Sequence, residues 1–549
     1  MVMTFSNGFC QINSHHTEDK CEVEGVMFEI DDVIYYWKHT HKNFCGTMES
    51  LIENNTIVCY DGKNLLKYFT AQCDINVIST EVKVLDMLIG GNLIDPNNPP
   101  DNFTNLQKLV SFVPEFTVAT ECVQQKCAWY LTVLRECFAK VRAVLVDQQL
   151  WNVFVEIEMP VLPIIAEMEH SGVRVDTELL KVMEESLLRR LRAAERACHA
   201  AAGRAFQLTS AAQVRAVLYE ELQLDVKGNV RVRETLCKGD KSTSETMLRS
   251  LMAVHPLPRL ILEYRHVQKA HATFVAGIAN QVKDGVIKPT WEQTAAVTGR
   301  IACSNPNLQA IPKAPFSLPL FPAETKEEEL LMEPNETLNF RSVYVPRAGH
   351  ALLAADFRHL ECRVLAGAAA DPALRAALAG RDLFAALAAA WLGKSEAAVA
   401  REERERTKRV VYALAYGAGA RRLADVLGLG YEHALATLAS FNRSFPMLKS
   451  FGRTVVARCE RAGGRLATPG GRGRTFPNIF SGDAALRAQA ERQAVNFIVQ
   501  GSAADLCKRA MAAAARAGAA ARRAPAAADP RRAGVGGAAR GPAPGRRGN

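Results

Sequence analysis

Four side chains in one segment of the sequence have the types and the spacing to bind a triphosphate. In R-E-R-T-K-R-V-V-Y-A-L-A-Y-G they follow one another at intervals of four residues, as Arg404, Lys408, Tyr412 and Tyr416. A step of four residues turns a helical side chain by only about 40°, so all four face one way. A guanidinium and an ammonium bind phosphate oxygens, and phenol rings pack against sugar and base. The pattern also suits a solvated basic face with two half-buried tyrosines.

A single aspartate is the candidate metal ligand. Asp356 follows the apolar run 350–355, which we expect to form a buried strand. A carboxylate at the end of a rigid strand suits Mg²⁺, a hard cation that takes few carboxylates together with substrate phosphates. Aspartate at a strand end is also a common helix cap, so the residue alone does not decide between the two roles.

A second polar stripe lies near the end of the periodic part of the sequence. Arg492, Asn496 and Gln500 are again four residues apart, with apolar residues on both flanks. Amides on one helix face can hydrogen-bond the minor-groove edges of base pairs. The alternative is a polar face in solvent, although a polar stripe between apolar flanks needs partners.

A loop rich in hydrogen-bond donors precedes both stripes. The segment 298–312 contains Arg300, Asn307 and Gln309, whose side chains can bind a sugar-phosphate strand. Loops of Asn, Pro and Ser are also ordinary turns. The order of the motifs along the chain is what makes them specific.

Together the motifs resemble those of family A DNA polymerases. In chain order they are T-G-R-x-x-x-x-x-P-N-L-Q-x-I-P, D-F-x-x-x-E-x-R-V-L-A, R-x-x-x-K-x-x-x-Y-x-x-x-Y-G and E-R-Q-A-x-N-x-x-x-Q-G-S-A-A-D. The resemblance covers about residues 151–511 well. It implies template-dependent transfer of nucleotides to a primer 3′-hydroxyl in DNA repair. It also implies primer-template DNA, deoxynucleoside triphosphates and DNA repair proteins as partners, and a two-metal Mg²⁺ site.

The resemblance assigns roles on the nucleotide side of the site. Asp356 would be the first metal ligand, and Glu361 would exclude a ribose 2′-hydroxyl. Arg404 and Lys408 would hold the triphosphate, with Lys408 also donating a proton to the pyrophosphate. Tyr412 would lie by the incoming sugar.

The remaining candidate residues are on the DNA side. Tyr416 would lie by the templating base. The residues that would hold primer and template near the new base pair are Arg300, Asn307, Gln309, Arg492, Asn496 and Gln500.

The chain departs from the family pattern after residue 510. Family members carry a His-Asp-Glu motif on a strand pair there, which supplies a second metal-binding carboxylate, whereas this chain continues with Ala and Arg. Residues 511–549 lack periodicity and aromatic side chains, and we expect them to be disordered. A truncated polymerase that binds primer-template or nucleotide without catalysis is therefore the alternative to an active enzyme.

The beginning of the chain resembles a proofreading exonuclease domain only faintly. Tyr68 stands four residues after Asn64, where an Asp is expected, and no D-x-E motif precedes it. Exonuclease chemistry needs a carboxylate cluster for its metals, so we expect no proofreading.

Periodicity predicts a multidomain α/β chain. The resemblance implies the palm, fingers and thumb of a family A polymerase. The predicted segments are a degenerate exonuclease-like α/β domain at 1–150, a mainly helical thumb at 151–290, the first part of the palm at 291–370, the fingers at 371–460, an incomplete second part of the palm at 461–510 and the tail at 511–549.

Composition adds little about function. The net charge is +9, but eight arginines and one aspartate give the last 39 residues +7 and leave +2 for residues 1–510. No apolar run approaches the roughly 18 residues of a membrane span, and the 14 cysteines are scattered singly. We expect a soluble, intracellular protein without a membrane partner; nuclear location is implied by the family role alone.

Overall fold

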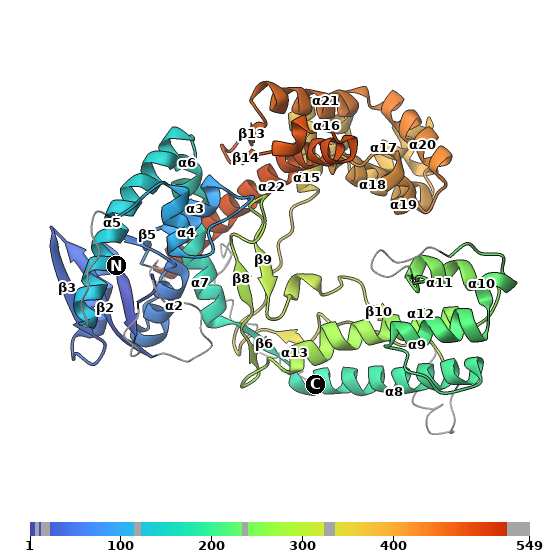
Figure 1. Cartoon of the computed structure of the whole chain (residues 1–549), viewed down its shortest axis with the longest axis horizontal. Helices are drawn as coiled ribbons and strands as arrows, with labels where there is room; N and C mark the ends of the chain where they lie inside the picture. Colours follow the sequence, from blue (N-terminus) through green and yellow to red (C-terminus); the bar gives the residue numbers. More distant parts are fainter. Residues whose placement is uncertain are drawn as a thin grey trace, which may run out of the picture. The chain divides into compact units, whose positions relative to one another are not determined.

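The computed structural model describes residues 1–5, 10–12, 22–78, 80–114, 122–232, 240–322 and 335–523. Its chain divides into two compact units (Figure 1). Among the described residues, the first unit comprises Met1–His170, Trp291–Ala302 and the chain from Leu353 onward, and the second comprises Ser171–Thr290 and Cys303–Leu352. The six predicted segments follow chain order, whereas the first unit combines parts that are far apart in sequence. The predicted boundaries stay a prediction.

The N-terminal part of the first unit is an α/β structure. Its strands form an antiparallel sheet in the order β1-β2-β3 and a parallel pair β4-β5, and helix α5 packs against β2 and α3. The elements are β1 Val2–Phe5, β2 Val23–Ile30, β3 Val33–Lys38, α1 Phe44–Asn54, β4 Thr56–Cys59, α2 Gly62–Cys73, β5 Lys83–Asp86, α3 Met87–Ile94, α4 Phe103–Leu109, α5 Val123–Asp147, α6 Trp151–Val153, η1 Phe154–Glu158, η2 Met159–Val161 and α7 Leu162–Ser171.

The strand-like run 26–36 in the sequence forms parts of two strands. Asp31 and Asp32 join β2 to β3 with φ of 50° and 62°. This left-handed backbone is the one that a tight two-residue hairpin requires, and aspartate tolerates it.

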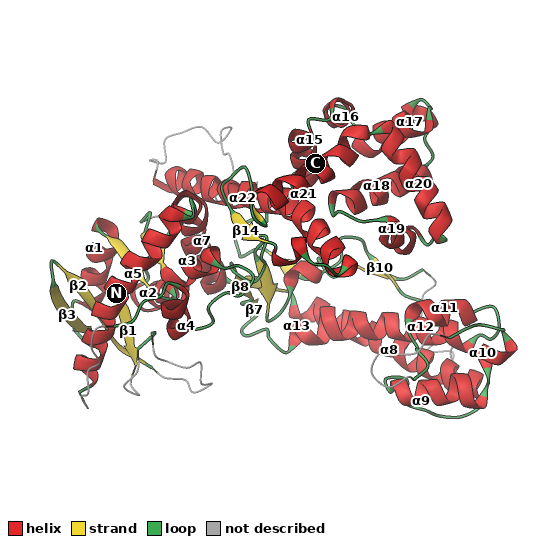
Figure 2. Cartoon of the chain, turned by 45° about the horizontal axis from the view of Figure 1, so that its top comes forward, coloured by secondary structure: helices red, strands yellow, loops and turns green. Residues whose placement is uncertain are grey.

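The C-terminal part of the first unit is mainly helical and has a core of its own (Figure 2). This core runs from Cys362 to Val499, with Phe384, Phe441 and Phe497 among its fully buried rings. The elements are α15 Leu360–Ala369, α16 Pro372–Ala379, α17 Leu383–Leu392, η6 Glu396–Ala398, α18 Arg401–Ala415, α19 Ala420–Leu427, α20 Tyr431–Ser444, α21 Pro446–Arg461, β13 Arg465–Ala467, β14 Gly473–Thr475, η7 Pro477–Phe480 and α22 Ala484–Arg523.

The second unit is built on the long helices α8 and α12, which pack against each other. Asp176 caps α8 by accepting the backbone N–H of Leu179 at 3.0 Å. The elements are β6 Val173–Val175, α8 Thr177–Ala202, α9 Ala211–Arg215, η3 Ala216–Glu221, α10 Leu224–Lys227, α11 Glu245–Leu251, α12 Leu257–Ala270, η4 His271–Ala276, α13 Gly277–Ala279, β7 Val286–Ile287, η5 Leu308–Ala310, β10 Phe316–Ser317, β11 Thr337–Leu338 and β12 Tyr344–Val345. Strands β8 Thr290–Glu292 and β9 Ala302–Ser304 lie where the chain passes between the units.

Membrane-spanning helices and disulfide bonds can both be checked in the structure. Within the described residues no single helix is long and apolar enough to cross a membrane; only the pair Gln124–Asp147 and Trp151–Ser171, bent by 114°, passes that test together, by length and composition alone. The described cysteines form no disulfide with one another.

The predicted disorder of residues 511–549 is wrong for its first part, because α22 continues to Arg523. Alanine has the highest helix propensity of all residues, so an Ala-rich segment can extend a helix that packing has already nucleated. Ala512 and Ala519 are buried. Pro525 follows shortly after, and a proline ends a helix. The rest of the predicted tail, 524–549, lies outside the described residues.

The end of α22 can be tested with two neighbouring alanines. We expect Ala512→Asp to lower the free energy of unfolding by about 1–3 kcal/mol, because it buries a carboxylate without a partner. Ala513→Asp, on the exposed side of the same turn, should change it by less than about 0.5 kcal/mol. Urea unfolding followed by circular dichroism measures both; equal effects would contradict the packed helix.

Candidate nucleotide and nucleic-acid site

Helix α18 carries the first stripe, as predicted. Three of its side chains surround the ring of Phe384 from α17, which is 1% exposed. The Arg404 Cζ lies 5.7 Å and the Lys408 Nζ 6.0 Å from the centre of that ring, and the Tyr412 ring centre lies 5.8 Å from it. The two cations and the tyrosine therefore share one face, and contacts with a buried aromatic ring hold them there.

The guanidinium of Arg404 is already bound by carboxylates. Its Nε donates to Asp382 Oδ2 at 2.7 Å, and its Nη1 pairs with Glu405. Asp382 Oδ1 also caps α17 by accepting the backbone N–H groups of Phe384 and Ala385. Burial acts to raise the pKa of Asp382, but the hydrogen bond and charge of Arg404 together with the backbone N–H groups of Phe384 and Ala385 outweigh it, and the pKa is lowered. Asp382 thus fixes both the start of α17 and the position of the cation.

Tyr416, the last residue of the stripe, connects α18 to two other segments. It follows the end of the helix, and its hydroxyl donates to Glu361 Oε2 at 2.7 Å. The other oxygen of Glu361, at the start of α15, pairs with Arg300. The ring centres of Tyr412 and Tyr416 are 6.3 Å apart. The structure therefore brings Arg300, Glu361 and the stripe into one constellation.

The second stripe meets the first. Burial raises the pKa of Tyr416, and the side chain of Gln500 on α22 is near enough to act in the opposite direction. Gly417, with φ +69°, lies so close to α22 that an added Cβ would be 3.0 Å from the Arg492 Cα. The Oδ1 of Asn496 is buried and has no hydrogen-bond partner among the described residues. A buried amide oxygen without a partner is costly, so this stripe contains one polar group that the described fold leaves unsatisfied.

The predicted strand 350–355 does not form, which corrects the expected setting of Asp356. Residues 351–358 are exposed and without regular structure, with Leu352 63% and Leu353 73% exposed. A strand needs a neighbour for its backbone N–H and C=O groups, and no described segment pairs with this one. An apolar run is thus insufficient to make a strand.

Asp356 remains near the stripe, and its role as a metal ligand stays a prediction. Its charge contributes to the raised pKa of Tyr412, after burial and the effect of Cys362. In the part of the chain that is described, no group of three or more His, Cys, Asp or Glu side chains could hold a metal ion. Within the described ranges, Asp356 is therefore not joined by the further carboxylates that a two-metal Mg²⁺ site needs.

Asn307 and Gln309, the other two candidates of the loop 298–312, have a local setting of their own. Both belong to the second unit, where the Asn307 side chain accepts the backbone N–H of Gln309 at 3.0 Å and caps η5. Asn307 therefore has a local structural role, and DNA contacts by these two residues stay predictions.

The comparisons with known proteins decide the family. A model of DNA polymerase family A matches residues 177–526. The chain belongs to DNA polymerase family A. Its fold is similar to that of the POL domain of Pol1 from M. smegmatis in complex with DNA primer-template and dNTP, with a TM-score of 0.76 and 25% identity over 91% of this chain and 84% of that one. The family and the polymerase fold expected from the sequence are confirmed.

Curated relatives of this family A chain are bacterial. DNA polymerase I, thermostable, from Thermus filiformis is 33% identical over 369 residues, 66% of this chain and 41% of that protein. DNA polymerase I from Pseudomonas aeruginosa is 32% identical over 367 residues, 66% of this chain and 37% of that protein. The chain thus spans about two fifths of the length of these relatives.

A buried ionic cluster, which the sequence analysis missed, holds α22 in place. Lys508 of α22 bonds both oxygens of Glu158 at 2.8 Å, and Arg472 pairs with Glu158 and with Asp505, the latter at 2.7 Å. Thr468 donates to Asp505 at 3.0 Å. Burial acts to raise the pKa of Glu158, but Lys508 and Arg472 outweigh it and lower the pKa to about 2. The only sequence signal was a pair of opposite charges three residues apart in D-L-C-K.

The cluster also touches the loop that carries Arg300. Gly299, with φ +79°, lies against Arg472, and an added Cβ would be 2.5 Å from the Cζ of that arginine. Only glycine fits there, both for the backbone conformation and for the space. The ionic cluster and the Arg300–Glu361 pair are therefore adjacent through one residue.

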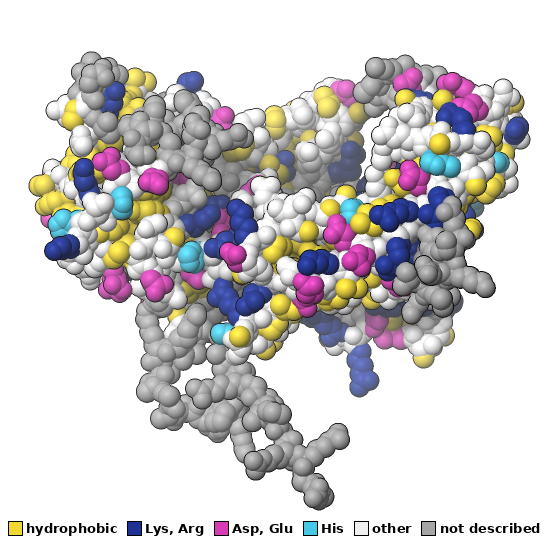
Figure 3. Space-filling model, turned by 90° about the horizontal axis from the view of Figure 1, so that it is seen from below, with side chains coloured by type: hydrophobic (Ala, Val, Ile, Leu, Met, Phe, Trp, Pro, Cys, Tyr) yellow, Lys and Arg dark blue, Asp and Glu magenta, His cyan; other side chains and the backbone are white. Residues whose placement is uncertain are grey.

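The surface charge is mixed. Figure 3 shows one face of the molecule, on which Lys and Arg side chains are interspersed with Asp and Glu and form no single basic field. Specific sites are thus more informative about nucleic-acid binding than net charge.

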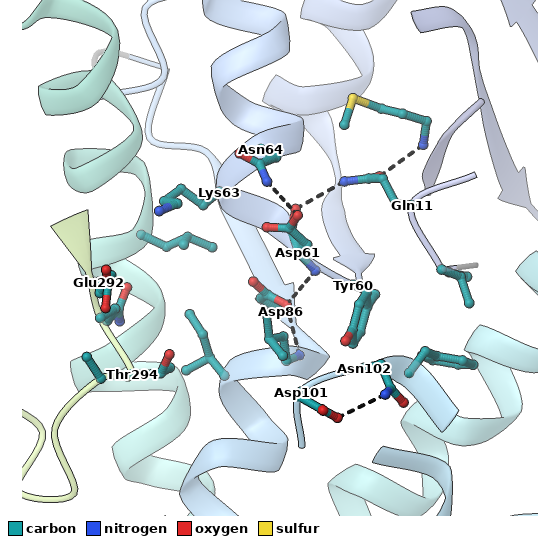
Figure 4. A pocket seen from close by; sticks show the side chains of 18 of the residues that line it. Gln11, Tyr60, Asp61, Lys63, Asn64, Asp86, Asp101, Asn102, Glu292 and Thr294 are labelled. Carbon is teal, nitrogen blue, oxygen red and sulfur yellow. Dashed lines mark hydrogen bonds between the residues drawn. The ribbon is translucent and has the colours of Figure 1, made fainter. Parts of the chain in front are cut away.

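The N-terminal part has a cavity of about 710 Å³ that contains several carboxylates (Figure 4). Asp86 is fully engaged, because it accepts the backbone N–H groups of Asp61, Gly62 and Leu88 at 2.8–3.0 Å. Burial and the charge of Asp61 raise the pKa of Asp86 to about 7. The Tyr68 hydroxyl has no hydrogen-bond partner among the described residues. Absence of proofreading stays a prediction.

Removing Arg472 should test the ionic cluster. We expect Arg472→Met to lower the free energy of unfolding by about 3–5 kcal/mol, since it leaves two buried carboxylates short of a cation. Arg461→Met, on the exposed end of α21, is the matched control and should change stability by less than about 0.5 kcal/mol. Denaturant unfolding measures both variants, and a small loss in Arg472→Met would show that the cluster contributes little.

Proposed function

We propose that the chain is a template-directed DNA polymerase of the nu type. The observation that carries this proposal is the face of α18, where Arg404, Lys408 and Tyr412 surround Phe384. Two sequence runs support the nu type: T-K-R-V-V-Y-A-L-A-Y-G-A-G and L-R-A-Q-A-E-R-Q-A-V-N-F-I-V-Q-G-S-A-A-D-L-C-K look most like polymerase nu.

The proposed reaction transfers a nucleotide to a primer 3′-hydroxyl. The primer 3′-hydroxyl releases its proton to solvent, and its oxygen bonds to the α-phosphorus as the bond to pyrophosphate breaks. Arg404 binds the triphosphate, and Lys408 binds it and donates a proton to the leaving pyrophosphate. Tyr416 is suited to the templating base because its ring is 38% exposed beside the stripe.

The proposed role is error-prone synthesis in translesion or crosslink repair in the nucleus, without proofreading and with DNA repair proteins as partners. The N-terminal part supports the lack of proofreading, because the carboxylate of Asp86 is occupied by backbone donors and Tyr68 stands where a carboxylate is expected. Primer and template would contact Arg300 and the exposed side of α22.

A second candidate function is binding without catalysis. It is favoured by the exposed segment 351–358 around Asp356 and by the lack of a metal-binding group within the described ranges. The surviving stripes would then hold primer-template or nucleotide while no transfer occurs.

Primer extension and a gel shift on the same protein separate the two candidates. We expect extension with all four deoxynucleotides and magnesium, and its loss in Asp356→Ala, while the shift of primer-template DNA persists. Glu432→Ala, which removes an exposed acid of α20, is the control and should extend normally. Binding without extension by the unaltered chain would reject the polymerase and select the binding module.

Glu361 should govern the choice between ribose and deoxyribose. We expect Glu361→Ala to raise ribonucleotide binding or insertion relative to deoxynucleotide by about 10-fold or more, because the side chain that meets the 2′-hydroxyl is gone. Glu361→Gln keeps the size and should retain most of the discrimination. Competition between labelled ATP and dATP measures the ratio in either candidate function. An unchanged ratio in Glu361→Ala would contradict this role.

A further inference from the structure

The outer strand of the N-terminal sheet presents apolar side chains to solvent. β3 is the edge strand in the order β1-β2-β3, and Figures 1 and 2 show it at the rim of its unit. Val33 is 50%, Ile34 36% and Tyr35 41% exposed. No described strand pairs with the free edge of β3. Natural proteins usually protect such an edge with charges, proline or a covering segment.

The register of β2 and β3 fixes which backbone groups face outward. Ile30 pairs with Val33 and Phe28 with Tyr35 across the hairpin. The pair that closes a two-residue hairpin is hydrogen-bonded, and hydrogen-bonded pairs then alternate. The N–H and C=O groups of Val33 and Tyr35 thus point to β2, while those of Ile34 point to the open edge.

Charges of opposite sign flank the exposed strand. Asp31 and Asp32 lie at its beginning, and Lys38 and His39 at its end, all exposed. Asp32 already contacts Arg135 at 2.7 Å and Lys38 contacts Glu24 at 3.3 Å, yet the side chains of Asp32 and Lys38 are 89% and 56% exposed. Both remain accessible to a partner.

We propose that β3 pairs antiparallel with β3 of a second copy of this chain, as a two-fold symmetric dimer. Outward-facing residues must oppose each other, so Ile34 of one copy faces Tyr36 of the other and Tyr35 lies on the two-fold axis. The same register places Asp32 opposite Lys38 of the second copy. A register centred on Tyr36 is also compatible with the backbone but gives Asp32 no opposite charge.

Both apolar and charged side chains would stabilise this dimer. Opposed aromatic and β-branched side chains stabilise antiparallel strands, as do opposed charges. Phe28 stacks on Tyr35 with ring centres 5.4 Å apart, so the central tyrosine is already held for a partner ring. The acidic beginning and basic end make the strand complementary to itself only in the antiparallel sense.

A charge swap between two variants tests the register. Sedimentation velocity of the full chain over a concentration series should show a dimer that weakens with added salt. Asp31→Lys with Asp32→Lys, and separately Lys38→Glu with His39→Glu, should each weaken self-association about tenfold or more, because like charges then meet at both ends. An equimolar mixture of the two variants should dimerise again.

A backbone variant keeps the test independent of the turn. Ile34→Pro removes an N–H that β2 does not use, so the variant should be monomeric with a melting temperature close to that of the unaltered chain. Ile34→Ala retains that N–H and is the control. A chain that is monomeric at every concentration, charge variants that dimerise normally, or a mixture that stays monomeric would each overturn the proposal; the first would leave the edge to another protein. None of these three outcomes depends on polymerase activity.

Discussion

The burial of four ionised side chains constrains how the segments of the first unit can pack. Each charge alone would cost several kcal/mol to bury, and only mutual contact makes the group tolerable. Glu158 comes from η1, Arg472 from the turn between β13 and β14, and Lys508 with Asp505 from α22. These segments must therefore meet within hydrogen-bonding distance. Because α22 also carries Gln500 and Asn496, the cluster sets where the polar stripe of the site can lie.

Two arginines of the site already form ion pairs with carboxylates of the protein. Arg404 is bound by Asp382, and Arg300 by Glu361. Such pairs restrict long side chains before any ligand arrives, which reduces the entropy that binding must remove. A phosphate would have to share or replace these contacts. The affinity for phosphate therefore depends on how much more favourable the guanidinium–phosphate contact is than the guanidinium–carboxylate contact that it replaces.

Sequence periodicity predicted the features that depend only on local helix geometry. The stripe on α18 and the stripe on α22 both follow from the four-residue spacing of their side chains. Long-range requirements were not visible in the sequence. The apolar run before Asp356 needed a partner strand, and the two cations that bind Glu158 lie more than 300 residues away in sequence. The Ala-rich extension of α22 was misjudged because composition typical of disorder is also strongly helix-forming.

A substitution at Gly299 would affect the site although glycine has no reactive group. It has no side chain and is neither acid nor base, yet it is the point at which the loop of Arg300 meets the guanidinium of Arg472. An added methyl group would push on both at once. In a collection of inherited or engineered variants, alanine at this position would resemble the loss of a reactive group, although the defect would be one of spacing and no reactive atom would have changed.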